Sequence, residues 1–152
     1  MRLGNFIGGA FVPPASGQYL DDIRPATGEV LAQIPDSDTA DVDAAVQAAK
    51  RAFPSWSTMR AEERSRILLK LADLIEQNLD ELALLESDDN GKPVSLAKRM
   101  DIPRAVANFR FFATAILHHA SEAHVTDATA LNYTLRQPIG VAGLISPWNL
   151  PL

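Results

Sequence analysis

Residues 138–152 read PIGVAGLISPWNLPL, and this stretch decides the fold class. Its first half, Val141–Ser146, is a continuous apolar run, which is typical of a parallel strand that is buried on both faces of a sheet. Its second half is a loop in which two prolines fix the backbone on either side of Trp148 and Asn149. A buried strand with a stiff exit loop predicts an α/β fold that binds its ligands at the carboxyl end of the sheet.

The remainder of such a sheet is missing from the sequence. A parallel strand requires a crossover helix and a second strand, and the chain ends at Leu152 before either of them. We therefore expect an incomplete fold with an unmatched strand and exposed apolar helix faces.

The exit loop at Trp148 and Asn149 has two interpretations. A stiff loop can aim the amide of Asn149 at a reacting oxygen, but the residues alone favour a turn residue beside a core aromatic, Trp148.

Two hairpins are predicted near the N-terminus. Asn5–Val12 has apolar residues on both sides of a Gly-Gly pair, and both glycines can adopt the positive φ that a two-residue turn needs. Residues 22–24 and 30–34 flank Pro25–Gly28, where proline presets φ and glycine adds freedom. The chain should therefore begin with a β-layer.

A helical block follows. Thr39 can cap a first helix whose apolar residues recur at helical spacing up to Pro54, where we expect the helix to stop. A second apolar stripe begins at Ile67, with a break expected near Asn78. It ends at Asp89–Pro93, because glycine suits the left-handed position after a helix and proline cannot continue one.

A third stripe opens near Pro103 and reaches Ala120, and its wide apolar face predicts a deeply placed helix. The pattern then changes to Leu131–Arg136, an alternating strand whose unpaired edge is a template for association. We accordingly divide the chain into three parts: hairpins and helices over 1–122, an arm strand over 123–137, and the central strand with its exit loop over 138–152.

The composition excludes several classes of function. The 152 residues are 47% hydrophobic and 22% charged, which is typical of one globular domain. The net charge is -5 and the basic residues are scattered, so no nucleic-acid partner is expected. No cysteine is present, which excludes a disulfide, a thiolate metal site or a cysteine nucleophile within these residues. No apolar run reaches the roughly 18 to 20 residues that span a bilayer, and no secretory signal is visible, so we expect a cytoplasmic protein without a membrane partner.

Residues 138–152 resemble the Pro-x-Gly-Val, apolar strand, Pro-Trp-Asn-x-Pro-Leu segment of the aldehyde dehydrogenase superfamily. Three more landmarks fall in the family's order, because Pro25–Val30 resembles its second hairpin, Ala48–Phe53 its first helix and Asp89–Pro93 its helix-ending turn. Three stretches look most like the branch that oxidises aminomuconic or hydroxymuconic semialdehydes, namely Phe53–Ser57, Met100–Arg104 and Asn108–Ala113.

The resemblance implies the N-terminal part of the aldehyde dehydrogenase fold: an incomplete Rossmann-like NAD(P)-binding domain with a strand of an oligomerisation arm. It implies that an aldehyde is oxidised to an acid through attack by a cysteine thiolate, hydride transfer and release by a glutamate-activated water. Asn149 matches the family's oxyanion asparagine, whose amide stabilises the tetrahedral oxygen. The stretch that lines the dinucleotide site is matched by Ile145, Ser146, Pro147 and Trp148. NAD is the expected cofactor, with NADP as the alternative, and no Gly-x-Gly-x-x-Gly fingerprint supports either.

In the family, the cysteine and the base glutamate lie downstream of this segment, which here means beyond Leu152. The chain is therefore expected to be an inactive piece of an enzyme that binds a small-molecule aldehyde and forms a homodimer or homotetramer. The alternative is a non-catalytic interaction module that pairs with a full-length subunit through the arm. The identity of the aldehyde is open, because residues outside the sequence shape its tunnel.

Two groups of residues are candidates for a metal site. Asp22, the carbonyl of Ile23 and Asp89 resemble positions where some family members hold a monovalent cation, although the residues alone favour surface carboxylates at turns. His118 and Glu122 are four residues apart, but further ligands at sensible spacing are missing, so we reject a metal there. Four acidic residues of the helical block are interpreted as a solvated face and not as catalytic bases, namely Glu62, Glu63, Glu81 and Glu86.

Overall fold

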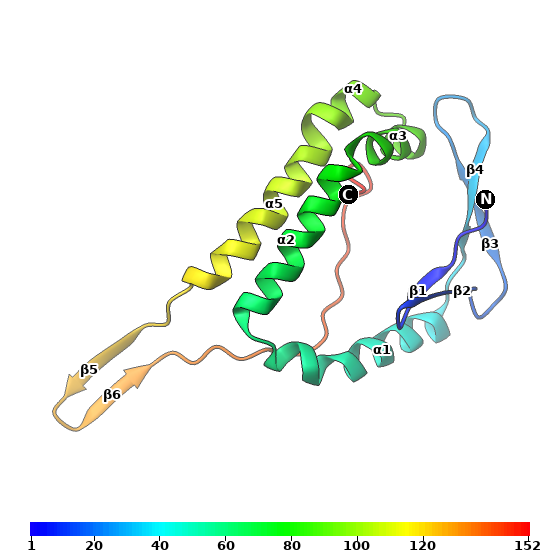
Figure 1. The fold of residues 1–152 in the computed structure, drawn as a ribbon. Helices are drawn as coiled ribbons and strands as arrows, with labels where there is room; N and C mark the ends of the chain where they lie inside the picture. The colour runs from blue at the N-terminus through cyan, green and yellow to red at the C-terminus, as the bar shows by residue number, and fades with distance from the viewer.

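The computed structural model describes all residues from Met1 to Leu152 (Figure 1). Two antiparallel helices, α2 (Ala61–Gln77) and α5 (Ile102–Ala115), lie side by side and form the centre of the molecule. The N-terminal hairpins and α1 (Thr39–Thr58) lie to one side of this pair, and a third hairpin projects from the far end of α5. None of the helices is long and apolar enough to cross a membrane.

Both predicted N-terminal hairpins are confirmed. Gly8 and Gly9 have φ values of 62° and 89°, which allows the two-residue turn of the first hairpin. An isolated bridge between Arg2 and Gln33 joins the two hairpins. The strands are β1 (Asn5–Ile7) with β2 (Ala10–Val12), and β3 (Tyr19–Ile23) with β4 (Val30–Pro35).

The start of α1 differs from the prediction by one residue. Asp38, not Thr39, caps the helix, because its carboxylate accepts a hydrogen bond of 2.8 Å from the Ala40 amide. Asp41 completes the capping box by accepting from the Asp38 amide at 3.1 Å. Asp41 is buried and also accepts from the Ala15 amide, so it ties the helix start to the hairpin layer.

The end of α1 also corrects the prediction, because the helix does not stop at Pro54 but continues to Thr58. Proline removes the backbone donor to the Lys50 carbonyl four residues earlier, and this single loss does not end the helix. Hydroxyl groups after the proline add hydrogen bonds to other carbonyls of the last turns. The hydroxyl of Ser55 donates to the Ala52 carbonyl at 2.9 Å, and that of Thr58 donates to the Pro54 carbonyl at 2.9 Å.

The predicted break at Asn78 is confirmed, since it separates α2 from α3 (Leu79–Asn90). The side-chain amide of Asn78 donates to the Leu74 carbonyl at 2.7 Å, and the backbone N–H of Asn78 donates to the same carbonyl at 3.1 Å, so both bonds mark the end of α2. Gly91 ends α3 with a φ of 77°, as the sequence predicts.

The third helical stretch begins earlier than Pro103. It consists of α4 (Val94–Leu96), a π-helical turn η1 (Ala97–Asp101), α5 and a final 3₁₀ turn η2 (Ile116–His118). The start of α5 is deeply placed, as predicted, because Ile102 is fully buried. It packs in a small core with Ala72, Ile75, Ala83, Ala97 and Val106. Only 13 of 152 residues are buried, so much of the apolar surface of the helices is exposed.

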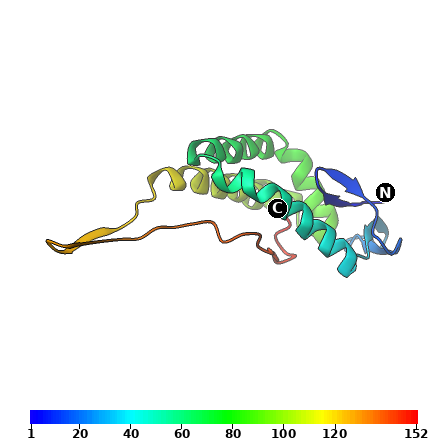
Figure 2. The same cartoon turned by 90° about the horizontal axis from the view of Figure 1, so that it is seen from below.

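The predicted arm strand is a hairpin. The strand expected over Leu131–Arg136 is shorter, β6 (Ala130–Tyr133), and it pairs with an unpredicted antiparallel partner, β5 (Ala123–Asp127). All residues of the hairpin are exposed. It has no neighbour within the chain, since it extends away from the helices in both views (Figures 1 and 2).

The central strand predicted over Val141–Ser146 does not form. Its backbone donors and acceptors require neighbouring strands, and the three two-stranded sheets of the structure do not include it. Residues 134–152 instead run back along one side of the helices to end near α3 (Figures 1 and 2). The division into parts 1–122, 123–137 and 138–152 stays a prediction.

Candidate functional site

The loop that carries Asn149 is a tight turn. The Leu150 amide donates to the Pro147 carbonyl at 3.4 Å, and Trp148 and Asn149 occupy the two central positions. Trp148 is 87% exposed, so the interpretation of this residue as a core aromatic is wrong for the chain. The side-chain amide of Asn149 is also exposed and makes no hydrogen bond within the chain, which leaves both of its N–H donors available.

The backbone of Asn149, in contrast, is held by Lys92. The Lys92 ammonium donates to the Asn149 carbonyl oxygen at 3.0 Å. Lys92 directly follows the left-handed Gly91, and its own amide donates to the Asn90 side chain at 2.9 Å. The turn that ends α3 therefore fixes the residue that reaches the loop.

Lys92 belongs to a partly buried charged cluster with Glu86 of α3 and Asp101 of η1. Its ammonium lies 2.8 Å from Glu86 Oε1 and 2.6 Å from Asp101 Oδ2. The three side chains are 16%, 3% and 13% exposed, in the order Lys92, Glu86, Asp101. The interpretation of Glu86 as part of a solvated face is therefore wrong. Sequence reasoning missed this cluster because its members follow no helical spacing.

The pKa values within the cluster follow from its hydrogen bonds. Burial lowers the pKa of Lys92, but hydrogen bonds to Asp101 and Glu86 outweigh that effect, and the pKa is raised overall. The hydrogen bond from Lys92 lowers the pKa of Asp101, and this effect is stronger than that of burial, which raises it. Lys92 and Asp101 are therefore both ionised at neutral pH.

The four predicted cofactor residues do not all lie together. Ser146, Pro147 and Trp148 line a shallow pocket of about 220 Å³ beside Asn149, together with Asp89. Ile145 is 95% exposed and lies outside that pocket. The pocket offers an aromatic face, a hydroxyl group and a carboxylate.

The predicted cation residues lie where the second hairpin meets α3. Arg24 links the two elements through an ion pair of 3.1 Å with Asp88. Burial raises the pKa of Asp89, and the charge of Asp22 raises it further. The two carboxylates are therefore close enough to repel each other. No group of three or more His, Cys, Asp and Glu side chains in the structure is arranged to hold a metal ion.

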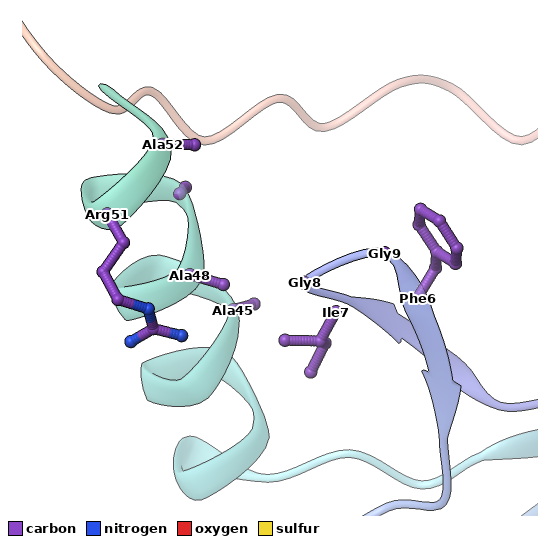
Figure 3. A pocket seen from close by; sticks show the side chains of 9 residues that line it. Phe6, Ile7, Gly8, Gly9, Ala45, Ala48, Arg51 and Ala52 are labelled. Carbon is purple, nitrogen blue, oxygen red and sulfur yellow. The ribbon is translucent and has the colours of Figure 1, made fainter. Parts of the chain in front are cut away.

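The largest groove lies elsewhere, between the β1–β2 turn and α1 (Figure 3). It has a volume of about 640 Å³ and shares no residue with the loop of Asn149. Ala45, Ala48 and Ala52 of α1 face the glycine turn, and Arg51 is the only titratable residue that lines the groove. It offers no group for acid–base or nucleophilic chemistry, so the loop is the better candidate site.

Comparison with known proteins identifies the family. The sequence model of the aldehyde dehydrogenase family matches residues 11–152. The chain belongs to this family. It is 56% identical over its whole length to the 2-aminomuconic semialdehyde dehydrogenase of Bos taurus, and 54% identical to that of Homo sapiens. It is 47% identical over 99% of its length to an acetaldehyde dehydrogenase of Pseudomonas aeruginosa. The chain spans 30–31% of the length of these relatives.

Solved structures of aldehyde dehydrogenases also match the chain. The structure of PnpE from Pseudomonas sp. WBC-3 matches all of the chain with a TM-score of 0.94 at 45% identity, over 31% of its own length. An indole-3-acetaldehyde dehydrogenase of P. syringae in complex with NAD+ and IAA matches 96% of the chain with a TM-score of 0.92 at 38% identity, over 30% of its own length. The predicted fold class, part of the aldehyde dehydrogenase fold, is thereby confirmed.

Proposed function

We propose that the chain is part of an NAD-dependent aldehyde dehydrogenase in which Asn149 stabilises the negative oxygen of the reacting aldehyde. The observation that carries the proposal is the state of Asn149, whose backbone is held by Lys92 while its amide donors are free. The names of the relatives at 53–56% identity favour 2-aminomuconic semialdehyde, or a related semialdehyde, as the substrate. The product is the corresponding carboxylic acid.

The role of Asn149 is electrostatic. When a nucleophile attacks an aldehyde, negative charge develops on the carbonyl oxygen, and a donor already fixed in place stabilises it without reorganisation. One donor of this kind contributes about 2.7–4 kcal/mol, which corresponds to about 10²–10³ in kcat. The cysteine nucleophile and its backbone donor come from outside these 152 residues in this proposal, because the sequence contains no cysteine.

NAD, when bound, accepts the hydride that leaves the aldehyde. The residues present fit only part of a dinucleotide. The exposed Trp148 ring can stack on a planar ring, and the Ser146 hydroxyl can donate to or accept from a ribose. Pro147 stiffens this surface, and Ile145 adds exposed apolar area next to it. None of the four provides the cradle of backbone amides that a pyrophosphate requires, so other residues must hold that group.

A monovalent cation at Asp22, the Ile23 carbonyl and Asp89 is part of the proposal. The raised pKa of Asp89 supports it, because a cation would relieve the repulsion between the two carboxylates. Sodium chloride should then raise the thermal midpoint of the chain more than choline chloride at equal ionic strength. The difference should vanish in Asp89→Asn.

The arm hairpin supports the proposed assembly as a homodimer or homotetramer, since β6 presents an unpaired edge to a partner sheet. The same exposed hairpin also favours the second candidate, a non-catalytic module that pairs with a full-length subunit. A cytoplasmic location stays a prediction from the sequence.

A chimera tests the catalytic proposal. Residues 1–152 replace the matching part of the bovine 2-aminomuconic semialdehyde dehydrogenase, and NADH formation is followed with a panel of aldehydes. Asn149→Ala should lower kcat by about 10²–10³ with little change in KM. Asn5→Ala is the matched control, because it removes an amide that bonds only to Ser37.

An Asn149→Ala chimera with unchanged kcat would overturn the role of Asn149. A chimera that folds and assembles but has no activity would favour the non-catalytic module. Binding of the unmodified chain to the full-length bovine enzyme, measured by sedimentation, would then test that candidate.

A further inference from the structure

The ammonium of Lys92 has three N–H donors, and the structure supplies three acceptors. Two are carboxylate oxygens, Glu86 Oε1 at 2.8 Å and Asp101 Oδ2 at 2.6 Å. The third is the Asn149 carbonyl at 3.0 Å. Each donor therefore has one partner, and the third reaches from the turn after α3 to a residue far along the chain.

That third hydrogen bond is the only one that ties residues 135–152 to the rest of the chain. The backbone bonds near this segment are Thr134 to Glu122, just before it, and Leu150 to Pro147, within it. No other side-chain hydrogen bond involves the segment. The segment also lines shallow pockets together with residues of α1, such as Lys50, and of α3, such as Asp89. Lys92 therefore supplies the one hydrogen bond that holds the loop to the helices.

We propose that Lys92, held by Glu86 and Asp101, is a positioning residue that sets the place and orientation of Asn149. This inference rests on the proposed function, because it assigns to Lys92 an effect on catalysis that passes through Asn149. Lys92 touches the backbone of Asn149 and leaves the amide free to act.

The two carboxylates come from different elements, and together they restrict the position of the Lys92 ammonium. Glu86 projects from α3, six residues before Lys92, and Asp101 projects from the π-helical turn, nine residues after it. Single π turns inside α-helices occur frequently at functional sites. Two short charge-assisted bonds in a partly buried setting leave the ammonium little freedom, so its third N–H points in a fixed direction.

Lys98 provides a matched control. It lies in η1, six residues after Lys92, and its ammonium is 2.8 Å from Asp80, but it is 40% exposed and makes no hydrogen bond to the loop. Lys98→Met therefore removes the same charge without touching Asn149.

The first test measures the order of the loop in the chain itself. Trp56→Phe leaves Trp148 as the single tryptophan, because the sequence has two. In this background the fluorescence anisotropy of Trp148 is followed in time, and its slow decay component reports a loop that tumbles with the whole chain. Lys92→Met should remove most of this slow component, whereas Lys98→Met should retain it. An unchanged decay in Lys92→Met, with unchanged helical circular dichroism, would overturn the proposal.

Lys92→Met leaves two buried carboxylates without a cation and can unfold the chain. The variant Glu86→Gln, Lys92→Met, Asp101→Asn is then measured instead, because it has no charge in the cluster but still lacks the donor to Asn149. If that variant unfolds as well, NMR of the unmodified chain decides. Coupling across the hydrogen bond from the Lys92 ammonium to the Asn149 carbonyl carbon supports the proposal, and coupling to Glu86 alone overturns it.

The second test separates positioning from a structural role in the chimera. Lys92→Met should lower kcat, by up to about 10²-fold if the donor moves by about 1 Å. In an Asn149→Ala background it should lower kcat no further, because the donor that it positions is already gone. Equal losses in both backgrounds would refute positioning through Asn149. If Asn149→Ala itself has no effect while Lys92→Met frees the loop, then Lys92 holds the loop but the proposed function fails.

Discussion

Substitution of Gly91 by alanine should destabilise the chain, and the structure indicates by how much. Gly91 has a φ of 77°, which costs a residue with a Cβ atom about 1–2 kcal/mol. A Cβ at this position would also lie 3.2 Å from Pro25 Cβ and 3.6 Å from Pro25 Cγ, so the turn of the second hairpin has to move by a few tenths of an ångström. We add about 1 kcal/mol for this overpacking, the lower end of its usual range.

Gly28 is a control that isolates the contact with Pro25. Its φ of 75° is nearly the same, but a Cβ atom would meet nothing within 4 Å. Gly28→Ala should therefore cost only the conformational part, about 1–2 kcal/mol, and Gly91→Ala about 2–3 kcal/mol. In a protein of this size each kcal/mol shifts the thermal midpoint by about 2–4 °C.

The assay is urea unfolding followed by circular dichroism, which reports mainly on the helices. Equal losses for the two variants would refute the reasoning, because the contact of Gly91 with Pro25 would then have no energetic consequence. Gly91 also precedes Lys92, so the Gly91→Ala variant should lose part of the slow anisotropy component of Trp148. Gly28→Ala should retain it.

Two further predictions concern the core and the charged cluster. Ile102→Ala should cost about 2–5 kcal/mol in urea unfolding, because the side chain is fully buried, and a loss below 1 kcal/mol would contradict its place in the core. Asp101 has a lowered pKa in the folded chain, so its stabilising effect is present above the ordinary value of about 3.9 and is lost as the pH falls through the lower folded value. The urea midpoint should therefore fall less steeply between pH 4 and pH 2 in Asp101→Asn, and equal slopes would argue against the pairing. Lys92 does not contribute to this pH dependence, because its pKa is raised and the stabilisation that it provides is lost only at alkaline pH.

The features that the sequence predicts well depend on neighbouring residues. The glycine turn of the first hairpin, the break at Asn78 and the left-handed Gly91 each follow from the conformational preference of one or two residues. The errors at Asp38 and Pro54 are also local. At Asp38 a side-chain hydrogen bond fixes the helix start, and at Pro54 the helix continues through the proline. Spacing of apolar residues reports neither feature.

The features that the sequence does not predict depend on distant residues. Lys92 and Asn149 are separated by 57 positions, and no periodic pattern links them. Glu86 looks like any acidic residue of a charged helix until Lys92 and Asp101 are placed against it. The role of Asn149 itself could be proposed only from the resemblance of its loop to a family, since a turn with an exposed amide has many other uses.

The unpaired segment before the loop bears on how well Asn149 can act. Leu144 and Ile145 are almost fully exposed, although their sequence is that of a buried strand. Burial of each by neighbouring strands would contribute about 1.5–3 kcal/mol. Such strands would hold the loop from its N-terminal side, whereas Lys92 holds it at Asn149. An amide that must meet an oxygen within about 0.5 Å needs both restraints, so we expect the Asn149 amide to be less ordered in the chain alone than in the chimera. The side-chain amide protons of Asn149 should therefore exchange more slowly in the chimera than in the chain alone, and equal exchange rates would contradict this expectation.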